Sequence, residues 1–81
     1  MENETFSIKQ VSELTGVSQN RIREWHDKGL LTQVEWINVG TRQHRRFTED
    51  DMRVIQKIDE LQEKGYLLWI AAQMAAEHVN K

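Results

Sequence analysis

A tight turn between two short amphipathic segments constrains the fold of this chain more than any other feature of the sequence. The first segment opens with a capping-box pair, Ser7 and Gln10. Apolar residues then recur at helical spacing: Ile8, Val11 and Leu14. In the turn, residues 15–18, Gly16 suits the left-handed conformation that ends a helix, and Ser18 is a good N-cap for the next one. We therefore expect two helices in quick succession.

The second helix is expected over residues 19–28, with Ile22 and Trp25 packed inward. Together the two segments form a helix-turn-helix pattern. The opposite face of the second helix is polar and carries Gln19, Asn20, Arg23, Glu24 and Asp27. Gln, Asn and Arg pair with base edges in the major groove of DNA, and a helix N-terminus offers N–H groups to a phosphate. Taken alone, however, this face is more typical of a solvated helix, in which Glu24 pairs with Lys28.

Residues 33–47 are expected to form a β-hairpin. β-Branched and aromatic residues alternate with polar ones up to Val39, and Gly40 suits the turn that follows. In the returning strand, alternation places Arg42 and His44 on one side and Arg45, with Phe47, on the other.

The returning strand carries three arginines within five residues: Arg42, Arg45 and Arg46. A charged hairpin that resists edge-to-edge aggregation is one explanation, but lysine would serve that purpose as well. Arginine is the usual choice for phosphate, because its planar fork donates two parallel hydrogen bonds. The absence of lysine from the cluster favours anion binding.

The rest of the chain is expected to be helical. Thr48 is a good N-cap, and the three acidic residues after it suit the positive end of a helix that runs to Gly65. A last, apolar helix is expected over residues 66–79. We assign Trp25 and Trp69 to the core, since a small domain needs large apolar residues, and leave Trp36 open.

Length and composition set the remaining limits. Eighty-one residues support one domain, which we expect over residues 6–81 after a flexible N-terminal segment, residues 1–5. The fold class is mainly α with a small β-hairpin. The chain has no cysteine, which fits a reducing, cytoplasmic setting, and no apolar run is long enough to span a membrane.

No motif indicates an enzyme or a cofactor. The histidines, His26, His44 and His78, lie in different elements without the spacing of metal ligands, so we expect no metal site. The carboxylates are explained by helix capping and solvated helix surfaces.

The net charge of −2 hides a strong asymmetry along the chain. Residues 16–47 contain six basic and three acidic residues, whereas residues 48–81 contain four basic and seven acidic ones. Phosphate contacts are local, so a basic face can function on an acidic protein.

The order of elements resembles the DNA-binding domain of the MerR family of transcription regulators. "FSIKQVSELTGVS" is similar to the family's opening helix and turn, and "IREWHDKGLL" to its "LRYYE..GLL" stretch. "HRRFTEDDMRVIQKIDELQEKGY" is similar to its "YRRYSEEDL…L..L...GF" stretch.

The resemblance implies a winged helix-turn-helix with four helices and a two-stranded wing, which binds double-stranded DNA. The helix over residues 19–28 would enter the major groove, and the wing, residues 33–47, would lie along the backbone. Gln19, Asn20 and Arg23 would contact bases, and Arg45 would be the wing arginine on phosphate. The full expected set is Ser18, Gln19, Asn20, Arg23, Glu24, Arg42, His44, Arg45 and Arg46.

The chain also departs from the family pattern. Glu24 and Trp25 replace paired tyrosines, so a backbone contact by tyrosine is lost. Gln43 and His44 replace the wing's Gly-Tyr, and Leu67 stands where a capping Ser or Thr is expected. The family's long dimerisation helix and effector domain have no counterpart within these residues, so we expect no small-molecule effector here.

Three functions follow as hypotheses. The first is the sequence-specific DNA-binding part of a bacterial MerR-like regulator. The second is a small architectural protein similar to phage or transposon excisionases, whose apolar last helix contacts a partner protein or a second copy. The third, which leaves the wing arginines without a role, is a protein-interaction module that binds no DNA.

Overall fold

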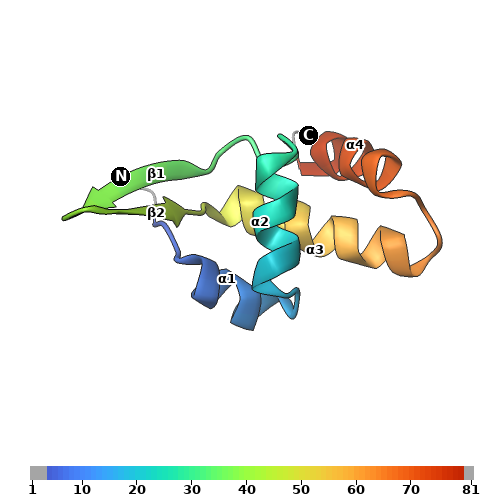
Figure 1. Ribbon diagram of the computed structural model, residues 1–81. Coiled ribbons are helices and arrows are strands. Elements are labelled where there is room, and N and C mark those ends of the chain that lie inside the picture. Colours follow the sequence, from blue (N-terminus) through green and yellow to red (C-terminus); the bar gives the residue numbers. More distant parts are fainter. Residues whose placement is uncertain (1–3, 80–81) are drawn as a thin grey trace.

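The structure is a computed structural model that describes residues 4–79, and within them the chain forms four helices and one two-stranded antiparallel sheet (Figure 1). In chain order the elements are α1 (Ile8–Thr15), α2 (Gln19–Asp27), β1 (Glu35–Val39), β2 (Arg42–Arg46), α3 (Glu49–Glu63) and α4 (Leu68–Val79). The expected mainly helical winged helix-turn-helix is confirmed.

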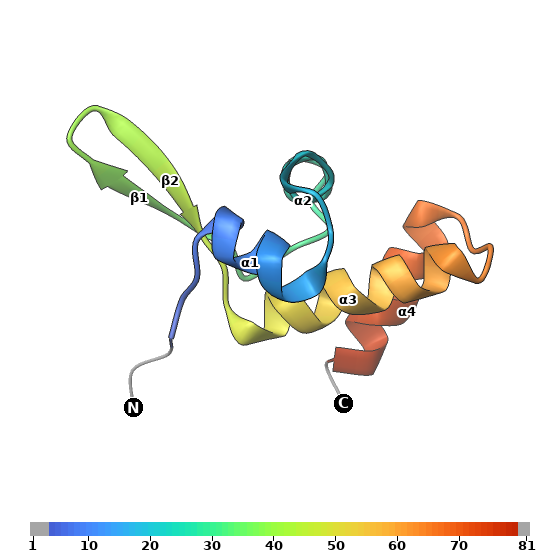
Figure 2. The same cartoon turned by 90° about the horizontal axis from the view of Figure 1, so that it is seen from below.

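The long helix α3 is the centre of the arrangement. The helix α2 and the β1–β2 hairpin project on one side of α3, whereas α4 packs behind it (Figure 2). The hairpin and the α3–α4 turn lie at opposite ends of the molecule (Figure 1). The structure therefore presents one helix and one hairpin together on a single side.

Side-chain caps set the limits of the first two helices. Ser7 and Gln10 form the expected capping box at the start of α1, and Gly16 ends this helix with φ 77°. In the turn, Ser12 Oγ donates to the carbonyl oxygen of Val17 at 2.7 Å. Ser18 Oγ then accepts the backbone N–H of Arg21 and caps α2. These local bonds fix the geometry of the helix-turn-helix.

The hairpin turns through Gly40 and Thr41, and Gly40 takes the positive φ of 62° that the turn requires. This two-residue turn pairs Val39 with Arg42 and, farther along, Trp36 with Arg45. At its base, Phe6 and Phe47 exchange two backbone hydrogen bonds of 2.8 and 2.9 Å, which tie the N-terminal segment to the wing.

A small core lies between α3 and the helices on both of its sides. Its fully buried large side chains include Phe47, Ile22, Ile55 and Ile58. Asp51 is also buried, because its carboxylate closes the capping box with Thr48 and accepts the backbone N–H of Gln33 at 3.2 Å.

One of the expected core positions is wrong. Trp25 is buried as expected, but Trp69 is 65 % exposed, since the alanine face of α4 packs against the core instead. Leu14, the last apolar residue of the α1 pattern, is 62 % exposed, whereas Val17 in the following turn is fully buried. Trp36, left open by the sequence, lies half exposed on the hairpin.

The predicted flexible segment, residues 1–5, lies mostly outside the described residues. Thr5, which is described, accepts hydrogen bonds from Arg46. In residues 4–79 no helix has the length and apolar character needed to cross a membrane.

Candidate nucleic-acid interface

The roll of α2 about its own axis is fixed by two buried residues. Ile22 and Trp25 face the core, so the opposite side of the helix is turned outward. The exposed residues of that side, with the N-cap, are Ser18, Asn20, Arg23, Glu24 and Asp27. Gln19, at the first position of the helix, is half-buried.

The polar side chains of α2 are paired with one another. Arg23 Nη1 donates to Asn20 Oδ1 at 2.8 Å, which joins two of the proposed base-contacting residues. Lys28 Nζ and Glu24 Oε1 are 2.8 Å apart, the intrahelical pair that the sequence spacing allowed. Both pairs are exposed and therefore weak enough to exchange for other partners.

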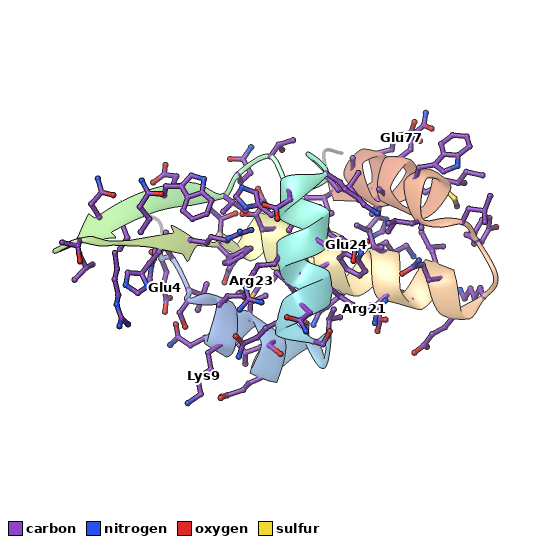
Figure 3. The ribbon with its side chains drawn as sticks, viewed as in Figure 1. Glu4, Lys9, Arg21, Arg23, Glu24 and Glu77 are labelled. Atoms are coloured by element: carbon purple, nitrogen blue, oxygen red, sulfur yellow. The ribbon has the colours of Figure 1, made fainter. Side chains whose placement is uncertain are left out.

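Arg21 anchors α2 to α3, a role that the sequence did not indicate. Its guanidinium donates to Asp59 Oδ1 at 3.0 Å and to Gln62 Oε1 at 2.9 Å, and it lies 4.9 Å from the centre of the Trp25 ring. Figure 3 shows Arg21 and Arg23 on different sides of α2, with Arg23 on the side nearer the wing. Of these two arginines, only Arg23 lies where a ligand that touches both α2 and the wing would meet it.

The three wing arginines divide between the two faces of the hairpin. Strand alternation and the observed register put Arg42, His44 and Arg46 on one face and Arg45, opposite Trp36, on the other. Arg42 and His44 are exposed. Arg46 donates to Thr5 from Nε at 3.2 Å and from Nη2 at 3.0 Å. Arg45 is therefore the wing arginine on the face away from Arg42 and Arg46.

Arg45 reaches from the wing to the C-terminal end of α2. Its Nη1 lies 3.3 Å from the carbonyl oxygen of Arg23, 3.0 Å from Nδ1 of His26 and 3.2 Å from Oδ1 of Asp27. The guanidinium also lies 4.7 Å from the centre of the Trp36 ring. The side chain is only 14 % exposed, so the wing and α2 are joined through this residue.

The contact with His26 requires a neutral imidazole. A guanidinium offers no acceptor, so His26 Nδ1 must accept the hydrogen bond from Arg45. Burial and the nearby Arg45 cation lower the pKa of His26 below its usual value of 6.5. At pH 7 His26 is therefore in the form that the contact needs.

A hollow of about 280 Å³ separates α1 and α2 from the wing. Its lining combines cationic, aromatic and amide side chains: Ile8, Arg23, Trp36, Gln43, His44 and Arg45. Trp36, Gln43 and His26 were not among the expected interface residues. A two-residue turn at Gly40 implies the Trp36–Arg45 pairing, so part of this arrangement was available from the sequence.

Within the described residues, no group of three or more His, Cys, Asp or Glu residues is arranged to hold a metal ion. The exposed groups of α2 and the wing are mostly cationic or uncharged polar side chains, with Glu24 and Asp27 as the carboxylates of α2.

Comparison with known proteins identifies the family. The chain matches the model of the MerR HTH family regulatory proteins over residues 6–77. None of the curated proteins compared with the chain matches it. Because the family match covers nearly all of the helix-turn-helix, wing and last two helices described above, this chain belongs to the MerR HTH family of DNA-binding transcription regulators.

Proposed function

We propose that this domain binds duplex DNA sequence-specifically, with α2 in the major groove and the β1–β2 wing along the adjacent backbone. The observation that carries the proposal is the shared orientation of α2 and the wing on one side of α3 (Figure 2). A major groove about 12 Å wide admits one helix, and an element beside that helix then meets the phosphates that border the groove.

In this arrangement α2 reads the bases. Arg23 is exposed, and its partner Asn20 is exposed beside it. Arg pairs with guanine and Asn or Gln with adenine, so Gln19, Asn20 and Arg23 supply direct readout. The N-terminus of α2 at Ser18 offers N–H groups to a phosphate. Glu24 exchanges its ion pair with Lys28 for a hydrogen bond that it accepts from the exocyclic amino group of a cytosine, or it disfavours other bases by repulsion.

The wing supplies the backbone contacts. Arg42 and His44 are exposed on one face of the hairpin, and Arg46 continues that face towards its base. Contacts of this kind position a protein on DNA without reading its sequence. Their loss is therefore expected to weaken binding to all sequences alike.

A salt titration tests the proposal. For Arg42→Gln we expect weaker binding to every duplex and a slope of log K against log salt reduced by about 0.9, the value for one lost phosphate contact. Lys64→Gln is the matched control, because Lys64 lies in the α3–α4 turn at the end opposite the wing (Figure 1). An unchanged slope in Arg42→Gln contradicts the wing's role. No binding of any duplex by the wild type at low salt favours the protein-interaction module.

The same titration, done with duplexes that carry a fluorophore at each end, measures DNA bending as well as affinity. Together these two quantities distinguish a regulator from an excisionase-like architectural protein. The proposed function predicts strong dependence of affinity on base sequence. Tight binding with large bending and little dependence on the contacted bases is the result that favours the architectural protein.

A further inference from the structure

The guanidinium of Arg45 is occupied by groups of the protein itself. Three acceptors from the end of α2 lie within 3.3 Å of its Nη1, and the Trp36 ring covers it at 4.7 Å. The side chain of Arg42, in contrast, is exposed to solvent on the other face of the hairpin.

The electrostatic surroundings of Arg45 favour this inward position. The carbonyl end of a helix carries partial negative charge, and the carboxylate of Asp27 adds a full one. The neutral His26 ring provides a third acceptor from the same turn of α2. Moving Arg45 onto a DNA phosphate would forfeit all three contacts and the stacking on Trp36.

We propose that Arg45 is a positioning residue that sets the distance and angle between the wing and α2, and that it is not a phosphate ligand. The inference rests on the proposed function, since that spacing matters because α2 and the wing must meet the same duplex. The family resemblance implies a phosphate contact for Arg45. The proposal assigns that contact instead to other residues of the wing, foremost Arg42.

The chemistry distinguishes arginine from lysine at this position. A planar guanidinium can stack on the Trp36 ring while it donates to several acceptors at once. An ammonium group keeps the charge but not the plane, so lysine cannot reproduce this geometry. At a phosphate contact, lysine loses the second hydrogen bond of the arginine fork but keeps the positive charge, so the salt slope and most of the affinity are retained.

The experiment compares Arg45→Lys and Arg45→Gln with the matched pair Arg42→Lys and Arg42→Gln in salt titrations on one duplex. We expect both Arg45 variants to bind about tenfold more weakly, the equivalent of one lost charge-assisted hydrogen bond. Their salt slopes are expected to stay close to that of the wild type. Arg42→Lys is expected to keep the wild-type slope and most of its affinity, and Arg42→Gln to lose about 0.9 from the slope.

Wild-type affinity for Arg45→Lys, together with a slope lower by about 0.9 for Arg45→Gln, would overturn the proposal. Trp36→Leu provides a second route, because it removes the stacking partner without changing charge. It is expected to weaken binding at an unchanged slope, and undiminished binding counts against the proposal.

A measurement without DNA keeps this inference separate from the proposed function. In the NMR spectrum of the free protein, Arg45→Lys should shift the resonances of the Trp36 indole and the His26 ring, whereas Arg42→Lys should leave both in place. Unshifted resonances in Arg45→Lys contradict a positioning role even if the wild type binds DNA. Shifted resonances support it even if the chosen duplex is not bound.

Discussion

At the scale of single residues, three arginine side chains connect different segments of the fold. Arg21 joins α2 to α3, Arg45 joins the wing to α2, and Arg46 joins the wing to Thr5. Arginine next to a basic hairpin suggests DNA contacts when only the sequence is considered. The structure shows that such residues also connect elements, and that Arg23 and Arg42 are the ones turned outward.

The His26–Arg45 contact predicts a pH dependence of stability. Since burial and Arg45 lower the pKa of His26 in the folded chain, the unfolded chain binds a proton more readily below pH 6.5. The free energy of unfolding should therefore decrease as the pH falls through 6.5 towards the folded pKa. Denaturant unfolding of the wild type and His26→Gln from pH 7.5 to 5 measures this, and the variant should lack that part of the decrease.

A partial control is available in Arg45→Gln. Removal of the neighbouring cation should raise the pKa of His26 towards 6.5 and reduce the pH dependence without abolishing it, because burial is the larger cause of the shift. A His26 that titrates identically in the wild type and in this variant contradicts the contact.

At the scale of secondary-structure elements, the sequence was sufficient wherever the deciding contact is local. The starts of α1, α2 and α3 follow from Ser7, Ser18 and Thr48, which bond to backbone N–H groups three residues away. The hairpin turn follows from Gly40.

Contacts between distant segments were not available from these patterns. Arg21 and Asp59 are 38 residues apart, and Arg46 and Thr5 are 41 apart. Helical periodicity also failed to place Trp69, because an apolar helix such as α4 does not indicate which of its faces packs inward. Small alanines allowed close packing on one face, and the tryptophan lies on another.

The capping box at the N-terminus of α3 is expected to contribute measurably to the free energy of unfolding. Thr48→Ala removes one cap and should lower the free energy of unfolding by about 1 kcal/mol. Asp51→Ala should cost more than Thr48→Ala, since it removes a buried side chain that both closes the capping box and accepts the Gln33 N–H.

Urea unfolding of both variants, with Asp50→Ala as an exposed control from the same turn, checks this order. Equal costs for Asp51→Ala and Asp50→Ala would show that the buried carboxylate does not link α3 to the segment before the wing.

At the scale of the whole molecule, charge and shape divide the protein in the same way. The basic excess lies in residues 16–47, which form α2 and the wing, whereas the acidic excess lies in residues 48–81, which include α3 and α4. An anionic duplex is attracted to the first part and repelled by the second. The overall net charge of −2 is therefore a poor guide to what the protein binds.

Size also bears on affinity. A single module of this kind buries about 600–1,000 Å² on DNA, so one copy should bind modestly. Leu67, just before α4, and Trp69, in its first turn, are exposed, and a protein contact through the last helix stays a prediction.

Base reading by α2 is tested by Arg23→Ala on a panel of duplexes that differ at single base pairs. This variant should lose its preference for particular bases at one or two adjacent positions, by about 1–3 kcal/mol each, and keep it elsewhere. Arg42→Gln should instead weaken binding to the whole panel uniformly. A uniform loss in Arg23→Ala, with the preference at every position intact, would contradict the placement of α2 in the major groove.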